Sequence, residues 1–221
     1  MEHSVEILMT EFVTHDVKRF ILEKPQGFEF VPGQATEVAI DKDNWREEKR
    51  PFTFTSLNSD SVLEFTIKTY PEHEGVTEQL HKLEPGEHLI IEEPFGTINY
   101  QGAGVFLAGG AGVTPFIAIL RQRRKEGEAK ENKMIFSNKK AKDVILEKEF
   151  REILGDNLTL TLTKEDREGY EARRIDQDYL KEKIDDFSQN FYVCGPPGFI
   201  EDITNSLKQL GADPDEITLE E

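Results

Sequence analysis

The stretch GGAGVTPF, residues 109–116, decides the fold that this sequence predicts. Residues 105–108 before it form a short apolar run typical of a buried strand, and residues 115–123 after it have the apolar spacing of a helix. Thr114 is placed to cap that helix, and Pro115 suits its first turn. The three glycines between strand and helix keep the turn free of side chains, as a close neighbour or an unusual backbone conformation would require.

Short alternating segments fill the first half of the chain, and turn signals rich in Gly, Pro and Asn separate them. The expected strands are residues 5–8, 17–22, 36–40, 52–55, 63–68 and 88–91. A short helix is expected at residues 76–81. Strands of this length and spacing predict a small antiparallel six-stranded barrel.

In the second half, strands alternate with helices, which predicts a parallel, doubly wound α/β sheet. The expected strands are residues 104–108, 133–136, 158–162, 190–194 and 216–219. The expected helices are residues 115–126, 144–153, 176–183 and 198–210. The sequence therefore predicts two domains, residues 1–100 and 101–221, with a boundary near residues 99–103.

The composition excludes several classes of function. A net charge of −17 argues against nucleic acid or an anionic membrane as a partner. The one cysteine cannot form an internal disulfide, a four-cysteine zinc site or an iron–sulfur cluster, and no metal site is predicted. Because no apolar run is long enough to span a membrane and the N-terminus lacks a signal-peptide pattern, we expect a soluble, cytoplasmic protein.

Ligands of a parallel sheet bind at the carboxyl ends of its strands, where helix N-termini point. The turn after strand 104–108 lies at such a place, and Gly110 and Gly112 there allow a pyrophosphate to approach the backbone. The alternative is a tight strand–helix turn that needs only a positive φ angle.

Two further segments bear on the ligand. In KRPFTFTSL, residues 49–57, strand alternation puts Arg50, Phe52 and Phe54 on one face. A guanidinium close to an aromatic ring suits an anionic group joined to a flat ring system, although an ordinary amphipathic edge strand is the alternative. In YVCGPPGF, residues 192–199, a rigid turn follows a buried strand, and Cys194 is either part of a site or a small buried apolar residue.

Taken together and in this order, these segments resemble the ferredoxin–NADP reductase superfamily, most closely its compact bacterial flavodoxin or ferredoxin reductase-like members. RPFT (50–53) is similar to the flavin motif Arg-x-Tyr-Ser/Thr, and EGVTEQL (74–80) to the Gly-x-x-Ser/Thr segment at the helix of the flavin barrel. GGAGVTP (109–115) resembles the glycine motif for the nicotinamide nucleotide, and YVCGPPGF the Cys-Gly-Pro-Pro motif beside the nicotinamide. The resemblance implies an FAD-binding barrel followed by an NAD(P)-binding α/β domain.

The resemblance also implies a role for each matching residue. Arg50 would bind the flavin pyrophosphate, Phe52 would lie against the isoalloxazine ring, and Thr53 would approach its reactive N5 edge. Further FAD contacts are implied for Pro51, Ile67, Lys68, Gly75, Val76 and Thr77. The pyrophosphate of NAD(P)H would be held by Gly110, Gly112, Val113 and Thr114, and its nicotinamide bordered by Cys194, Gly195 and Pro196. The implied catalytic residues are Thr53, Cys194 and Glu220.

The nucleotide preference depends on SNKKAKD, which follows strand 133–136. Ser137, Lys139 and Lys140 are placed to bind a 2′-phosphate, and no acidic residue comes directly after the strand. This favours NADPH over NADH, with a solvated lysine run as the alternative.

The sequence departs from the family pattern at two places. Phe52 stands where the motif has Tyr, which keeps ring stacking but loses a hydroxyl hydrogen bond. The chain ends ITLEE, without the aromatic residue that covers the flavin in many relatives.

The implied reaction is hydride transfer from NAD(P)H to FAD, followed by electron transfer to a separate protein such as flavodoxin or ferredoxin. The alternatives are a flavin reductase or oxygenase reductase component, and a non-catalytic nucleotide-binding module that senses redox state. An electron-transfer subunit with its own [2Fe–2S] cluster is disfavoured by the single cysteine. Candidate contacts for an acidic acceptor are Lys42, Arg46, Lys49 and residues 123–125.

Overall fold

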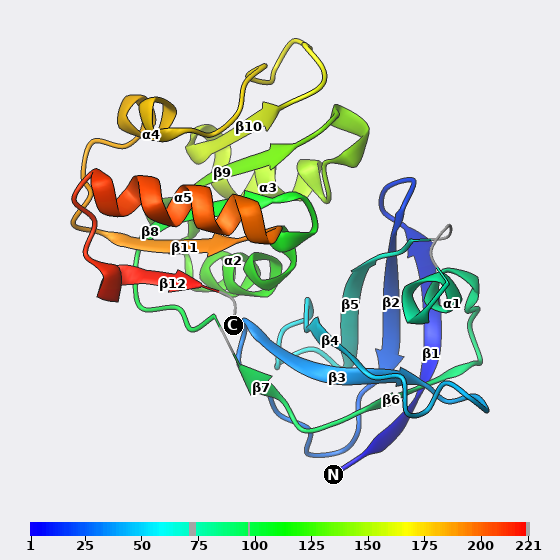
Figure 1. Cartoon of the computed structure of the whole chain (residues 1–221). Coiled ribbons are helices and arrows are strands. Elements are labelled where there is room, and N and C mark those ends of the chain that lie inside the picture. Colours follow the sequence, from blue (N-terminus) through cyan, green and yellow to red (C-terminus); the bar gives the residue numbers. More distant parts are fainter. Residues whose placement is uncertain (71–73, 97, 220–221) are drawn as a thin grey trace. The chain divides into compact units, whose positions relative to one another are not determined.

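The computed structural model describes residues 1–70, 74–96 and 98–219. The chain divides into an N-terminal unit, Met1–Thr97, and a C-terminal unit, Ile98–Glu221 (Figure 1). Each unit has its own hydrophobic core. None of the described helices is long and apolar enough to cross a membrane.

The N-terminal unit is an antiparallel barrel whose strands follow the order β4-β3-β6-β1-β2-β5. The strands are β1 (His3–Phe12), β2 (Val17–Glu23), β3 (Gln34–Ile40), β4 (Arg50–Thr53), β5 (Val62–Lys68) and β6 (His88–Ile91). A bridge between Phe54 and Phe65, with a 2.8 Å hydrogen bond from the Thr55 amide to the Glu64 carbonyl, brings the two ends of this path together. The predicted six-stranded barrel is confirmed, and the two-residue strand β7 (Phe95–Gly96), which pairs with β3, was not expected.

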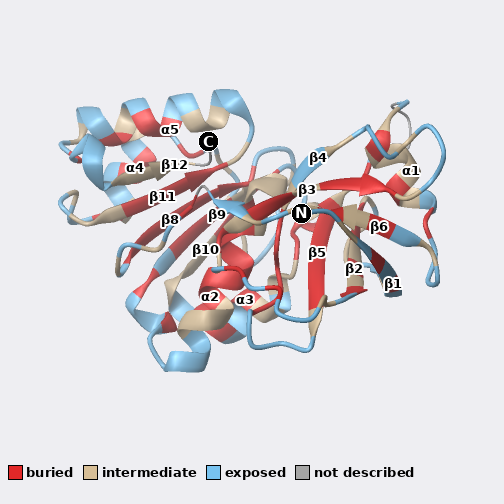
Figure 2. Cartoon of the chain, turned by 90° about the horizontal axis from the view of Figure 1, so that it is seen from below, coloured by how far each residue is buried: buried red, intermediate tan, exposed pale blue. Residues whose placement is uncertain are grey.

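Strand alternation fills the barrel with apolar side chains, which Figure 2 shows as buried stretches along the strands. The Phe54 ring lies at its centre, 4.4 Å from the ring of Phe30 and 5.0 Å from that of Phe65. Helix α1 (Val76–Lys82) adds Val76 and Leu80 to this core. The helix therefore packs against the barrel through its apolar side.

The C-terminal unit is a parallel sheet with the strand order β10-β9-β8-β11-β12. Its strands are β8 (Gly104–Gly109), β9 (Lys133–Asn138), β10 (Leu158–Leu162), β11 (Asn190–Cys194) and β12 (Ile217–Leu219). Its helices are α2 (Thr114–Glu126), α3 (Glu147–Leu154), α4 (Gln177–Lys183) and α5 (Pro197–Gln209). The predicted parallel α/β sheet is thus confirmed.

Alternation along β8 and β9 assigns the helices to the two faces of this sheet. Phe106 packs edge-on against Phe116 of α2, with ring centres 5.0 Å apart, and Phe136 packs against Phe150 of α3 at 6.1 Å. The alternate residues Val105 and Leu107 join a core cluster with side chains of α4 and α5, among them Leu180 and Leu207. The sheet is therefore covered on both faces, as its nearly continuous apolar strands require.

Candidate functional site

The glycine turn joins β8 to α2 through a single 3₁₀ turn, Gly110–Val113. Gly110 has a φ of +56°, and apart from its chain neighbours no heavy atom of the described residues lies within 4 Å of the place that a Cβ would take. Its conformation favours glycine, and the space beside it is open. The open cradle fits an anionic group that needs close contact with the backbone.

Thr114 does not cap α2, which corrects the expectation from the sequence. The helix begins at Thr114 itself, after Val113, and the Thr114 hydroxyl donates a 3.0 Å hydrogen bond to the carbonyl of Ala111. The 3₁₀ turn displaces the helix start by one residue. The hydroxyl therefore stabilises the turn instead of accepting a hydrogen bond from a helix N–H.

Gly112 is required by packing within the protein. A Cβ at this position would lie 2.5 Å from the carbonyl carbon and oxygen of Cys194 and from the Cα of Gly195. The sequence suggested that Gly112 makes room for a ligand, but its missing side chain makes room for the backbone of the Cys-Gly-Pro-Pro turn. The glycine turn and the Cys-Gly-Pro-Pro turn therefore pack directly on one another. Gly112 and Cys194 are 82 residues apart in the sequence.

The Cys-Gly-Pro-Pro turn is held from both sides. Cys194 ends β11, opposite Ala108 of β8, and its side chain is buried. A Cβ on Gly195 would lie 2.7 Å from the Phe199 ring of α5. Pro196 precedes α5 and is exposed, so it presents a rigid surface at the same sheet edge as Gly110.

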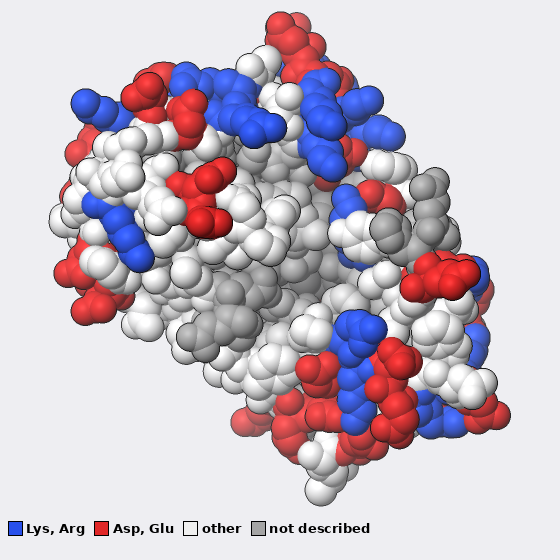
Figure 3. All heavy atoms as spheres, in the orientation of Figure 1, with Lys and Arg blue, Asp and Glu red and all other residues white. Residues whose placement is uncertain are grey.

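Ser137 lies at that edge as well, because it pairs in register with Gly109 of β8. Lys139 and Lys140 follow β9 and are exposed, and the Lys164 amide donates a 2.9 Å hydrogen bond to the Lys139 carbonyl. Among the described residues, no carboxylate lies within ion-pairing distance of the side chains of Lys139, Lys140 or Lys164. Figure 3 shows Lys and Arg side chains gathered over this part of the C-terminal unit.

The segment RPFT, which resembles a flavin motif, occupies β4, an outer strand of the barrel path that pairs with β3. Arg50 is exposed and donates to the carbonyl of Lys49 at 2.6 Å and to the Glu48 carboxylate at 3.4 Å. Phe52 is partly buried against the barrel core, and Thr53 is buried. Along the strand, the cation of Arg50 is therefore followed by the partly exposed surface of Pro51 and Phe52 and then by the buried Thr53.

A second cation beside Arg50 is already neutralised. Lys49 donates to the carboxylates of Glu2, at 2.7 Å, and Glu92. These hydrogen bonds raise the pKa of the Lys49 ammonium. Arg50 is therefore the better-placed cation for a phosphate on this strand.

The segment before α1 also leaves backbone groups available. Gly75 has a φ of +156°, and apart from its chain neighbours no heavy atom of the described residues lies within 4 Å of its Cβ position. Within the described part of the chain, no side chain caps the first turn of α1; Val76 is buried, and Thr77 is partly exposed. The amides of residues 75–77 therefore fit an anion, because the helix offers them no side-chain acceptor.

Two residues of β5, Ile67 and Lys68, already have partners within the protein. The Ile67 side chain is buried in the barrel core. Lys68 forms a 2.9 Å ion pair with Asp16. Burial acts to raise the pKa of the Asp16 carboxyl, but the hydrogen bond and charge of Lys68 outweigh it, and the pKa lies below its ordinary value.

Glu220, the third implied catalytic residue, lies outside the described residues.

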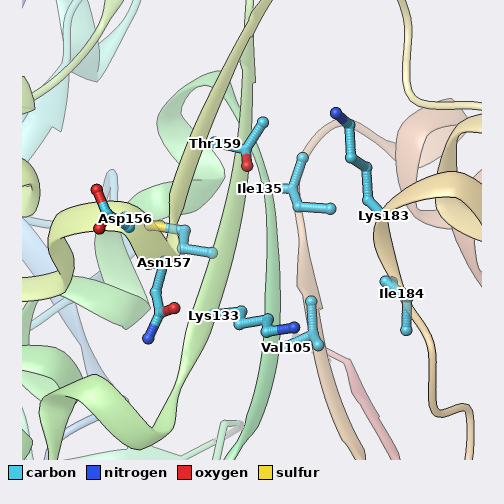
Figure 4. Close-up of a pocket in the computed structure, with 9 residues that line it drawn as sticks. Val105, Lys133, Ile135, Asp156, Asn157, Thr159, Lys183 and Ile184 are labelled. Carbon is cyan, nitrogen blue, oxygen red and sulfur yellow. The ribbon is translucent and has the colours of Figure 1, made fainter.

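A cavity of about 210 Å³ lies elsewhere in the C-terminal unit (Figure 4). Val105, Lys133 and Asn157, among the residues that line it, mark the amino ends of β8, β9 and β10. The cavity is therefore at the opposite sheet edge from the glycine turn. It plays no part in the predicted nucleotide site.

Comparison with known proteins identifies a domain in each of the two units. Residues 4–100 match the oxidoreductase FAD-binding domain, and residues 106–205 match the oxidoreductase NAD-binding domain. The two models together span nearly all of the chain. The chain therefore consists of an oxidoreductase FAD-binding domain followed by an oxidoreductase NAD-binding domain. An FAD-binding domain followed by an NAD-binding domain was therefore predicted correctly from the sequence.

Individual relatives are distant. The chain is 24% identical, over 96% of its own length and 66% of the relative's, to the ferredoxin–NAD(P)+ reductase component of the naphthalene 1,2-dioxygenase system of Pseudomonas putida. It is 27% identical to NADH-cytochrome b5 reductase 2 of Mycosarcoma maydis, over 90% of this chain and 63% of that protein. The chain thus spans slightly less than two thirds of the length of both relatives.

A ferredoxin NADP+ reductase from Neisseria gonorrhoeae, solved with bound FAD and NADP, has the same fold. The TM-score is 0.86 at 18% identity, over 99% of this chain and 98% of that one.

Proposed function

We propose that this chain takes hydride from NAD(P)H onto bound FAD and passes the electrons to a separate acceptor protein. The observation that carries the proposal is the pair of turns at Gly110–Val113 and Cys194–Pro196, packed backbone to backbone at the carboxyl edge of the parallel sheet. A rigid, open edge of this kind fits a dinucleotide, and the chain's other unit is an FAD-binding domain.

In the N-terminal unit, we assign the flavin to β4 and the segment before α1. Arg50 holds the pyrophosphate after exchanging its contact with Glu48, and the amides of residues 75–77 hold the same group. Phe52 orients the flavin ring, and Thr53 lies at the ring edge, with Pro51 keeping the strand rigid. Lys68 lines the site once it is released from Asp16, and Ile67 contributes through its backbone. Bound FAD supplies a ring system that accepts hydride and releases electrons one at a time.

In the C-terminal unit, the Gly110 turn holds the nicotinamide dinucleotide through its backbone, with Val113 and Thr114 fixing the start of α2. Gly112 acts by letting the two turns meet. Cys194, Gly195 and Pro196 border the nicotinamide and orient it. Thr53 and Cys194 are positioning groups in this proposal, because the reacting atoms belong to the cofactors.

We infer that NADPH is preferred over NADH. Ser137, Lys139 and Lys140 lie at the sheet edge beside Gly109, and the two lysines have no carboxylate partner in the described part of the chain. A phosphate gains charge-assisted hydrogen bonds from such residues without displacing an ion pair.

The proposed acceptor is a small electron-transfer protein such as ferredoxin or flavodoxin. A second candidate, the reductase component of an oxygenase system, is supported by the names of two relatives, the naphthalene 1,2-dioxygenase reductase component and the propane 2-monooxygenase reductase component of Rhodococcus jostii. Steady-state rates with ferredoxin, flavodoxin, an oxygenase component and free flavin as acceptors separate these candidates.

The first test is an anaerobic absorption spectrum of the purified protein, recorded before and after adding NADPH and then NADH. We expect a yellow protein that bleaches with NADPH faster than with NADH. Binding of either nucleotide without bleaching of bound FAD would contradict the proposed reaction and support a non-catalytic nucleotide-binding module.

A further inference from the structure

A lysine lies inside the barrel. Lys18 shares the inward face of β2 with Phe20 and Leu22, and its exposed fraction is 2%. A cation at such a position is costly unless the protein provides partners for it. The partners that Lys18 has therefore indicate what it does.

The Lys18 ammonium lies under the end of α1. It donates to the carbonyls of His81, at 3.1 Å, and Leu83, at 2.5 Å. The rings of Phe12 and Phe20 flank it, with their centres 5.4 and 5.5 Å from the nitrogen. These contacts satisfy carbonyls that the helix leaves unpaired and place a positive charge at its negative end.

A second contact holds the same end of the helix. The His81 ring nitrogen Nδ1 lies 2.9 Å from the Thr69 hydroxyl. Thr69 in turn donates to the carbonyl of Asp16, through its hydroxyl at 3.1 Å and its amide at 2.8 Å. The last turn of α1 is thus tied to β2 by Lys18 and to the β1–β2 turn by Thr69.

The helix needs these ties because it is short. Seven residues form a marginal helix in isolation, so its position depends on tertiary contacts. Among the residues that the structure describes, no side chain caps its first turn at Gly75. Besides the apolar packing of Val76 and Leu80, the polar contacts between α1 and other described residues of the barrel are at its last turn.

We propose that Lys18 is a positioning residue for FAD, which fixes residues 75–77 against the flavin pyrophosphate by holding the other end of α1. The proposal rests on the assignment of the pyrophosphate to these residues under the proposed function. Because riboflavin has the same ring system but no phosphate, Lys18 affects the binding of FAD and leaves the binding of riboflavin unchanged.

The test compares Lys18→Met and Lys18→Arg with wild type. FAD or riboflavin is titrated into flavin-free protein, flavin fluorescence gives the Kd, and a melting curve without flavin shows that each variant is folded. We expect Lys18→Met to raise the Kd for FAD about tenfold, the scale of a lost charged hydrogen bond, and to change that for riboflavin less than about twofold. Lys18→Arg should restore most of the FAD affinity. Lys42→Met, which removes an exposed lysine paired with Glu87, is the matched control and should change neither Kd.

Equal losses for FAD and riboflavin, or an unchanged FAD Kd in folded Lys18→Met, would overturn the proposal. If Lys18→Met does not fold, Thr69→Val is tested in its place. This variant removes the contact between the Thr69 hydroxyl and the His81 ring with little change in side-chain volume. We expect a rise of roughly threefold in the FAD Kd alone, and no change would again overturn the proposal. A wild-type protein that binds riboflavin as tightly as FAD would contradict the assignment of the pyrophosphate itself, and the positioning role with it.

Discussion

Gly110 and Gly112 lie two residues apart in one turn and lack a side chain for different reasons. Gly110 faces open space with a φ of +56°, whereas a Cβ on Gly112 would meet the backbone of Cys194 and Gly195 at 2.5 Å. A motif predicts that glycines are needed but not which neighbour each one accommodates. We therefore expect substitutions of Gly110 and of Gly112 to have different effects.

Gly112→Ala should destabilise the protein. Backbone atoms at 2.5 Å cannot move aside as a flexible side chain can, so we expect a loss of about 1–3 kcal/mol in the free energy of unfolding. Gly198→Ala is the control, because it lies in α5 with no atom within 4 Å of its Cβ position, and it should be neutral or stabilise by up to about 1 kcal/mol. Urea unfolding measures both, and equal effects would contradict the packing role of Gly112.

Cys194→Ser should slow flavin reduction by NADPH more than it weakens FAD binding. The thiol is buried at the end of β11, and small displacements of the turn misalign the nicotinamide, so we expect a loss of roughly tenfold in rate. Stopped-flow absorbance measures the rate, and a titration measures the FAD Kd. A wild-type reduction rate would refute a positioning role for Cys194.

At the scale of elements, the starts of α4 and α2 show when a capping residue can be predicted from the local sequence and when it cannot. Asp176 caps α4 as an acidic residue before a helix should, and it accepts a 2.8 Å hydrogen bond from the Tyr179 amide. Thr114 looks equally suitable before α2, but the 3₁₀ turn at Gly110–Val113 places it inside the helix. The difference lies in the turn geometry, which the close packing at Gly112 constrains.

Asp176→Ala should lower the free energy of unfolding by about 1 kcal/mol, because it removes the cap of α4. Asp176→Asn should keep most of the stability, since the amide oxygen can accept the same hydrogen bond. Asp178→Ala, an exposed change in the first turn, serves as the control for loss of charge. Thermal unfolding measures all three, and an equal loss in the Asn variant would point to charge instead of capping.

The loop after β9 should set the nucleotide preference. The double variant Lys139→Glu, Lys140→Glu should raise the KM for NADPH by roughly tenfold or more and leave the KM for NADH nearly unchanged, because only NADPH carries the 2′-phosphate. The double variant Lys142→Glu, Lys148→Glu changes the net charge by the same amount in the following segment and is the control. Equal changes for NADPH and NADH would show that this loop does not recognise the phosphate.

At the scale of the molecule, the acidic chain neutralises most cations that were candidates for an acceptor site. Lys42 pairs with Glu87, Arg46 with Asp41 and Lys49 with Glu92. On α2, Arg123 pairs with Glu126 and Arg124 with Glu152. An acidic acceptor must therefore displace internal ion pairs to use these cations.

The division into two units predicts separate footprints for the two ligands. In hydrogen exchange, FAD should slow the amides of residues 50–53 and 75–78, and adding NADPH should slow residues 109–114, 137–140 and 194–196. The control is NADH, which should reproduce the second footprint except at residues 137–140. Protection of the β8, β9 and β10 amino ends by NADPH would instead place the nucleotide in the cavity of Figure 4.

The sequence by itself determined the order of strands and helices along the chain, both folds and the FAD- and NAD-binding domains, because periodicity, turn residues and motifs are local properties. Boundaries shifted by a few residues, as at α3, which begins at Glu147, and the two-residue strand β7 had no signal of its own. Tertiary structure alone decided that Gly112 serves packing, that the Ile67 side chain faces the barrel core and that Lys49 is neutralised. It also decided that Lys18, by alternation an anomaly inside the barrel, meets the end of a helix more than 60 residues away in sequence. The physical reason is the same in each case: the partner that defines the residue's role is distant in sequence and meets it only when the chain has folded.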